Sequence, residues 1–324
     1  MNRNEMMKMN EGYYTQQIKD KNPYKLVYFE AKVLNDFIYD PRYQINNFIF
    51  KCNISIKEKF DNTDDFDDNN KIILDNIGFG YNEKNVRIIS VFLKNLSELP
   101  YKMQNRFYTY EINNNNTFLD PGFIKSINGR WNDEISIINA IHYEMKQINE
   151  ICEGDENFFK EIYSDNNLKE FNILLLPTKN EYNSFISTFD KLLSDNINKK
   201  YFKEKSESYR EKNTIRLLKE WLEKIDVDSE IINKIINPIV NVRNQRNKPS
   251  HSISDDEYNI DFYNEQTNIL KSVYCSLKCL INVLIKYYKK ENFNLEEWFI
   301  NNNILSHSLE EIKNQNNKNY QMIQ

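Results

Sequence analysis

The glycines of this 324-residue chain are confined to its first half. All six lie at or before Gly154, and after that point only Pro177, Pro238 and Pro249 interrupt the sequence. Glycine and proline are the residues that most disfavour a helix interior. The second half is therefore predicted to be helical, whereas the first half has the breakers that turns between strands require.

The first half mixes two hydrophobic periods. β-Branched and aromatic residues predict strands over residues 48–56, 71–74, 86–93 and 107–112. An apolar stripe that includes Ile141, Met145 and Ile148 predicts a helix over residues 133–152. We therefore expect an α+β domain over residues 1–177.

Apolar residues at helical spacing dominate the chain after Pro177. They form four stripes, at residues 182–193, 215–225, 232–240 and 269–288, and residues 295–303 predict a short fifth helix. Wide apolar faces on consecutive helices with short connections pack against each other as a bundle. We expect an all-α helical bundle over residues 178–305 and a polar tail over residues 306–324. The Asn237-Pro238 pair predicts a kink or a restart of the third helix.

The charge and hydropathy patterns limit the partners and the cellular compartment that the chain can have. There are 43 basic and 48 acidic residues, so the net charge is −5, which argues against broad nonspecific affinity for nucleic acid. The N-terminal residues lack the apolar run of a secretory signal, and the apolar stretch at residues 280–285 is too short to cross a bilayer. We expect a cytoplasmic protein with no membrane association.

Only three histidines are present, and they limit the candidate chemistry. None of them lies near a cysteine or near paired carboxylates at ligand spacing, so no metal site is predicted. Six glycines also argue against a cofactor held in a glycine-rich cradle, and we expect no cofactor. His142 falls within a helical stripe and His307 in the polar tail, which leaves His251 as the candidate for proton transfer near neutral pH.

A local cationic cluster precedes His251. Residues 231–254 contain Lys234, Arg243, Arg246 and Lys248 and no acidic residue, although the surrounding residues 181–300 balance 19 basic against 19 acidic side chains. Arginine offers a planar fork to oxyanions, and a nearby histidine can move a proton. The cluster therefore predicts a phosphate site.

The residues from Arg246 to His251, Arg-Asn-Lys-Pro-Ser-His, resemble the R-x4-6-H signature of the HEPN superfamily of small helical bundles. The polar residue usual after the arginine is present as Asn247. The motif also stands where that family has it, at the end of one bundle helix and before a long one. The resemblance covers residues 181–303.

This resemblance implies a metal-independent endoribonuclease formed by two HEPN protomers, whose motifs face one composite cleft. His251 would act as general base or acid on the ribose 2′-hydroxyl and the leaving 5′-oxygen. Arg246 would hold the scissile phosphate and offset the charge of the transition state, and Asn247 would orient one of these groups. Cleavage would leave a 2′,3′-cyclic phosphate.

The family often supplies toxins or abortive-infection effectors against phage, governed by a protein partner or a fused domain. The first half would then be a regulatory or sensing domain. Charge alone suggests that Arg243 and Lys248 contact the RNA backbone.

Two other interpretations stay open. The bundle could be a non-catalytic dimerisation or binding module in a defence or regulatory complex. Arg246 could also cap carbonyls at the end of its helix, where the helix dipole favours a cation. The many tyrosines near the N-terminus, among them Tyr13, Tyr14 and Tyr24, are interpreted as a core and its rim, not as a base-stacking platform.

Overall fold

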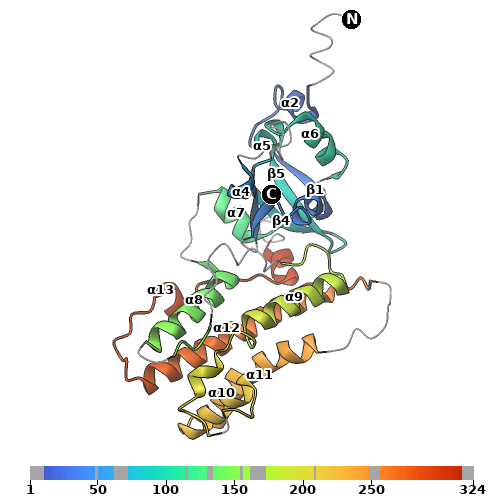
Figure 1. Cartoon of the computed structure of the whole chain (residues 1–324). Coiled ribbons are helices and arrows are strands. Elements are labelled where there is room, and N and C mark those ends of the chain that lie inside the picture. Colours follow the sequence, from blue (N-terminus) through green and yellow to red (C-terminus); the bar gives the residue numbers. More distant parts are fainter. Residues whose placement is uncertain are drawn as a thin grey trace, which may run out of the picture. The chain divides into compact units, whose positions relative to one another are not determined.

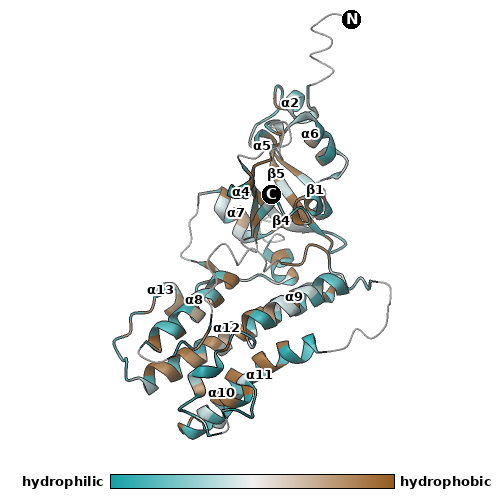
Figure 2. Cartoon of the chain, in the orientation of Figure 1, coloured by the Kyte–Doolittle hydropathy of each residue, from teal (hydrophilic) through white to brown (hydrophobic). Residues whose placement is uncertain are grey.

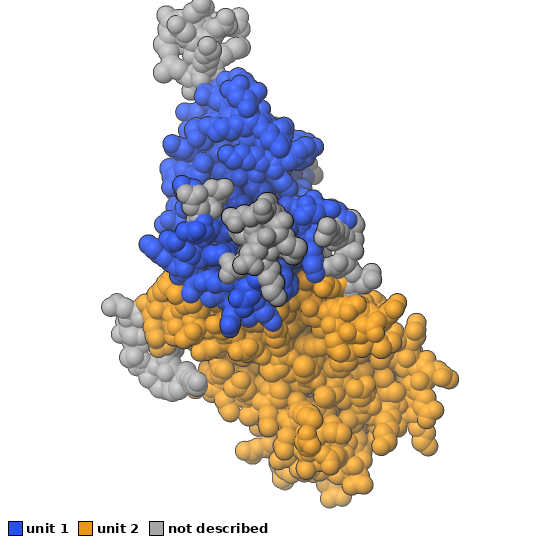
Figure 3. Space-filling model, turned by 180° about the vertical axis from the view of Figure 1, so that it is seen from behind, with its two compact units in different colours: residues 1–132, 307–324 blue, residues 133–306 orange. Residues whose placement is uncertain are grey.

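The computed structural model describes residues 11–47, 50–61, 72–113, 116–129, 134–153, 156–160, 173–207, 209–247 and 256–315. The chain divides into two compact units (Figures 1 and 3). Unit 1 comprises residues 1–132 and 307–324, and unit 2 comprises residues 133–306. The division therefore falls earlier than Pro177, the boundary that the sequence predicts. The reason is that helix α8 (Ile137–Ile151) packs along helix α12 (Asp261–Tyr287).

An antiparallel sheet forms the centre of unit 1. In the described part of the chain its strands follow the order β2-β3-β4-β5-β1-β6, and β7 pairs with β4. The strands are β1 (Leu26–Glu30), β2 (Tyr43–Asn47), β3 (Lys51–Ile56), β4 (Leu74–Asn82), β5 (Arg87–Phe92), β6 (Glu111–Ile112) and β7 (Thr117–Leu119). Along β3 the buried residues alternate, which is the pattern of a strand with one covered face.

Short helices surround this sheet. They are α2 (Tyr13–Gln17), α3 (Asn35–Ile38), α4 (Glu58–Asp61), α5 (Leu93–Ser97), α6 (Tyr101–Tyr108) and α7 (Pro121–Ile127), with the 3₁₀ helix η1 (Ala31–Leu34). The prediction of an α+β first half is thus confirmed at the level of fold class.

The strand predictions hold for β3 and β5, which lie within the predicted ranges 48–56 and 86–93. Of the predicted range 71–74, only Leu74 belongs to a strand among the described residues, because β4 runs from Leu74 to Asn82. The strand predicted over 107–112 is wrong, because α6 starts directly after Pro100 and continues to Tyr108, so only Glu111–Ile112 is extended. Phe107 is fully buried on this helix and packs edge-to-face on Phe29 of β1, with ring centroids 5.2 Å apart. Its aromatic character reflects core packing and not a strand.

The segment after residue 306 returns to unit 1. Leu309 and Ile312 are buried there, and the Lys313 ammonium donates to the side-chain oxygen of Asn85. His307 Nδ1 lies 3.1 Å from Oδ1 of Asp120, the N-cap residue of α7. As far as residue 315, the segment predicted to be a polar tail therefore contributes to the core of unit 1.

The contact between His307 and Asp120 predicts a pH-dependent stability of unit 1. Burial opposes protonation of His307, but the hydrogen bond and charge of Asp120 outweigh it and raise the pKa of the imidazole. A raised folded-state pKa stabilises the fold fully below the unfolded value of about 6.5, and this stabilisation is lost as the pH rises through the folded pKa. Urea unfolding of wild type should therefore show stability falling as the pH rises above about 6.5. The fall should be smaller in His307→Gln, and an identical slope in both proteins would contradict this role.

Unit 2 is predominantly helical in its described residues. Its elements are β8 (Ile135–Ser136), α8, α9 (Lys179–Leu192), the 3₁₀ helix η4 (Lys199–Phe202), α10 (Thr214–Lys224), α11 (Ser229–Arg246), α12, α13 (Glu297–Ile300) and β9 (Ile304–Leu305). Helix α12 packs against α8, α9 and α11 (Figure 1). The stripes predicted after Pro177 are confirmed as α9, α10, α11 and α12, and their apolar faces are visible in Figure 2.

Among the described helices, α12 meets the length and hydropathy of a membrane span. Half of its most apolar 18-residue window is buried inside the structure. Its buried residues include Val273, Leu277 and Leu284, and it packs against three helices of unit 2. The core helix of a soluble bundle has the same composition, so the expectation of no membrane association stays a prediction.

Helix α11 passes through Pro238 as a single helix. Of the kink or restart predicted at Asn237-Pro238, the restart does not occur, although proline removes one backbone hydrogen bond from a helix interior. The stripe is buried on both sides of the proline, at Ile235, Ile236 and Ile239, and Ser276 of α12 donates to the Ile235 carbonyl at 2.6 Å. Packing and this hydrogen bond hold both halves of α11 against α12.

Candidate functional site

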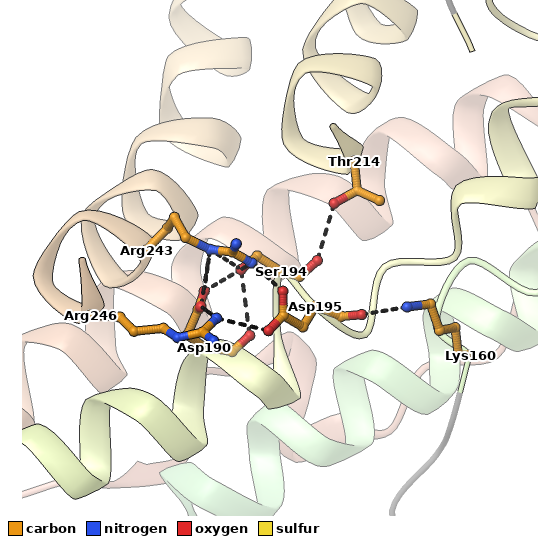
Figure 4. Close-up of polar contacts among 7 residues, drawn as sticks. All are labelled: Lys160, Asp190, Ser194, Asp195, Thr214, Arg243 and Arg246. Atoms are coloured by element: carbon orange, nitrogen blue, oxygen red, sulfur yellow. Dashed lines mark hydrogen bonds and ion pairs between the residues drawn. The ribbon is translucent and has the colours of Figure 1, made fainter. Parts of the chain in front are cut away.

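The predicted cationic cluster lies where the end of α11 meets the end of α9. Arg243 and Arg246 stand three residues apart in the last turns of α11, so they share one face of the helix. Asp190 belongs to the last turn of α9, and Ser194 and Asp195 follow in the turn after it. Figure 4 shows both guanidinium groups directed at these three residues.

Arg243 is held through its side-on fork, the edge formed by Nε and Nη2. Nε donates to Asp190 Oδ1 at 3.0 Å and also to Ser194 Oγ at 3.1 Å. Nη2 donates to Ser194 Oγ at 2.6 Å and to Asp195 Oδ1. The hydroxyl of Ser194 in turn donates to Asp190 Oδ1. The edge that arginine usually offers to an oxyanion is therefore occupied in Arg243 by the chain itself.

Arg246 is held differently, through a single nitrogen. Its Nη1 donates to Asp190 Oδ2 at 2.6 Å and to Asp195 Oδ2 at 2.8 Å. Its Nε and Nη2 have no hydrogen-bond partner among the described residues, and the side chain is 34% exposed. Arg246 thus keeps the fork that can bind a phosphate in a bidentate manner, while two carboxylates fix its position.

The two carboxylates differ in their surroundings. Asp190 has no exposed side-chain surface, whereas the side chain of Asp195 is 42% exposed. Partial burial opposes ionisation of Asp195, but Arg243 and Arg246 outweigh it and hold the pKa of this carboxyl below its usual value. The hydrogen bond to Asp190 is the main cause that raises the pKa of Arg246 further. Asp195 and Arg246 are therefore charged at neutral pH and form an ion pair.

The turn that carries Ser194 and Asp195 is itself anchored. The Lys160 ammonium donates to the Asp195 carbonyl at 2.6 Å, and Thr214 Oγ1 donates to the Ser194 carbonyl at 3.1 Å (Figure 4). Ser194 is 1% exposed. The acidic partners of the arginines are consequently held in a fixed backbone frame.

The structure places three of the five predicted site residues. Arg243 and Arg246 lie together, and Asn247 is the C-cap residue of α11, whose N–H donates to the Arg243 carbonyl at 3.1 Å. Lys248 and His251 lie outside the described residues. The interpretation of Arg246 as a cap of helix carbonyls is not supported, because its Nη1 donates to the carboxylates of Asp190 and Asp195.

Sequence reasoning missed Asp190, Ser194 and Asp195. One signal was present: Asp190 is an acidic residue that directly follows Phe189 on the apolar stripe of a predicted helix. A charged residue at such a position is buried only when it has a partner. Arg243 and Arg246 are the partners of Asp190.

The described residues contain no group of three His, Cys, Asp or Glu side chains arranged to hold a metal ion. Searches against protein-family models, curated proteins and solved structures find no match to this chain.

Proposed function

We propose that unit 2 is a HEPN-type, metal-independent endoribonuclease. The observation that carries the proposal is the state of Arg246: its Nη1 is fixed by two carboxylates, and the Nε and Nη2 edge has no partner among the described residues. A fixed cation with an available fork is suited to a phosphate diester, because it stabilises developing charge without rearranging. The motif residue His251 follows five positions later in the sequence.

In the proposed reaction, Arg246 binds the non-bridging oxygens of the scissile phosphate. His251 of one protomer removes the proton of the ribose 2′-hydroxyl, whose oxygen forms a bond to phosphorus as the bond to the 5′-oxygen breaks. The second motif of the dimer returns a proton to the 5′-oxygen. The products are a 2′,3′-cyclic phosphate and a 5′-hydroxyl, and Asn247 orients one of the reacting groups.

Arg243 and Lys248 have different roles in this proposal. Arg243 supports the site, because its fork already serves Asp190, Ser194 and Asp195. Lys248 contacts the RNA backbone. The cellular role would be that of a cytoplasmic toxin or anti-phage abortive-infection effector, with unit 1 as its regulatory or sensing part.

The test is cleavage of a labelled tRNA pool by the purified full chain in EDTA. We expect wild type to cut the RNA and His251→Ala to be inactive although equally folded by circular dichroism. His142→Ala serves as the control, because His142 lies within α8, away from the motif in the sequence. Cleavage that needs a divalent metal, or that survives in His251→Ala, would contradict the proposal.

A second candidate is the non-catalytic dimerisation or binding module. It is favoured by the ion pairs themselves, because two arginines facing two aspartates can be a purely structural cluster. A structure of the dimer separates the two candidates. The nuclease requires both copies of His251 to face one solvent-accessible cleft, whereas the module permits His251 to be buried within one chain.

A further inference from the structure

Unit 1 contains a cavity of about 570 Å³ beside the edge of its sheet. Helix α2, the end of α6, the start of β1 and strand β6 line it. Cavities of this size are typical of sites for small molecules. The cavity is therefore large enough to enclose one mononucleotide.

Aromatic rings form one side of this cavity. The ring of Tyr13 lies 4.3 Å from the ring of Tyr108, centroid to centroid, and the two planes are tilted by 42°. Tyr108 is 51% exposed, so part of its ring is open to a ligand. Exposed aromatic rings stack on nucleobases of any sequence, since every base has a π face.

A carboxylate faces the cavity in a fixed position. Glu111 is exposed on β6, and its Oε2 accepts a hydrogen bond of 2.8 Å from the hydroxyl of Tyr14, which is 1% exposed. Its Oε1 has no hydrogen-bond partner among the described residues. Glu111 thus presents an acceptor that the N–H groups of a base edge can use.

Two lysines supply positive charge at the same cavity. Lys21 and Lys25 both line it and are exposed; the Lys21 ammonium donates to Gln17, and Lys25 has no side-chain partner among the described residues. Glu111 is the only acidic residue of the lining in the described part of the chain. The cavity therefore combines a stacking face, a hydrogen-bond acceptor and a cationic rim.

We propose that this cavity binds a mononucleotide. The base stacks on the Tyr108 side of the ring pair, its N–H groups donate to Glu111, and its phosphate contacts Lys25 and Lys21. A phosphopeptide would use the lysines but not the aromatic face or the carboxylate acceptor, so the combination favours a nucleotide. The proposal concerns unit 1 alone and does not depend on RNA cleavage by unit 2.

The test is isothermal titration calorimetry of the full chain with GMP and AMP. We expect Tyr108→Ala to weaken binding of the nucleotide by about 5- to 100-fold, the range for loss of one stacked aromatic ring. Lys25→Gln should weaken it about 2- to 5-fold and lower its dependence on salt.

Two matched controls separate the cavity from the rest of α6. Tyr101→Ala removes a tyrosine of the same helix that is 46% exposed and does not line the cavity, and Lys102→Gln removes an exposed lysine beside it. Both should bind the nucleotide as wild type does. The proposal would be overturned if neither GMP nor AMP binds, if inorganic phosphate binds as tightly as they do, or if only single-stranded RNA binds. Tyr101→Ala weakening nucleotide binding as much as Tyr108→Ala does would also overturn it.

Discussion

RNA cleavage by Arg246→Gln is expected to be about 100- to 1,000-fold slower than cleavage by wild type, the usual cost of removing one donor that stabilises an oxyanion. The reason is that Arg246 alone of the two arginines keeps its Nε and Nη2 edge unpaired among the described residues. Arg246→Lys should recover little of this loss, because lysine keeps the charge but has no fork. Initial rates on one labelled RNA, measured in EDTA, check the expectation.

The control for this prediction is Arg216→Gln. Arg216 is an exposed arginine of α10, away from the cluster in the sequence. It should cleave RNA as wild type does. A loss of activity in Arg246→Gln that is matched by Arg216→Gln would show that the effect is one of general charge and not of the site.

The second prediction concerns stability. Replacing Asp190 with alanine is expected to lower the free energy of unfolding by about 3–5 kcal/mol, the cost of breaking a buried ion pair by removing one partner. Asp190 is fully buried and accepts hydrogen bonds from Arg243, Arg246 and Ser194. Urea unfolding monitored by circular dichroism measures the effect. The proposed RNA cleavage should slow as well, because Arg246 loses its main support.

Asp195→Ala is the matched control for Asp190→Ala. Asp195 bonds the same two arginines, but its side chain is 42% exposed, and exposed ion pairs contribute at most about 1 kcal/mol. The two variants should therefore differ in stability by more than about 2 kcal/mol. Equal destabilisation would show that burial does not set the strength of this cluster.

Much of unit 2 could be predicted from the sequence because its helices have long and regular apolar stripes. Helix α9 begins one residue after Thr178, which caps it, and the predicted stripe from Tyr182 is buried along it. The apolar stripe of α8 predicts a helix. The sequence does not predict that this helix packs on α12, which comes much later in the chain. The domain boundary therefore differs from the one at Pro177.

Unit 1 was harder to predict because its core depends on contacts between distant segments. The chain after residue 306 looked like a polar tail, yet Leu309 and Ile312 are buried in unit 1 and His307 bonds Asp120. Leu309 and Ile312 are the two apolar residues between positions 306 and 315, too few to give a helical stripe. Such burial follows from tertiary packing, and local patterns carry no signal for it.

The candidate site could also be predicted only in part, because it depends on contacts between distant segments. The cationic cluster is visible in the sequence because no acid interrupts it, and its members Arg243 and Arg246 lie together at the end of α11. The aspartates that complete it stand more than 45 residues earlier, with Asp190 at a separation of 56 residues from Arg246. Nothing in the spacing pairs them, and only the packing of α9 on α11 brings them together.

The most direct test of the proposed function is the chemistry of the RNA ends. Wild-type protein is incubated in EDTA with an RNA that has one mapped cleavage site and with the same RNA carrying a 2′-deoxy sugar at that site. We predict 2′,3′-cyclic phosphate ends on the first RNA and no cleavage at the substituted sugar. Ends with a 3′-hydroxyl, or equal cleavage of the 2′-deoxy substrate, would contradict proton transfer from the 2′-hydroxyl and with it the HEPN-type mechanism.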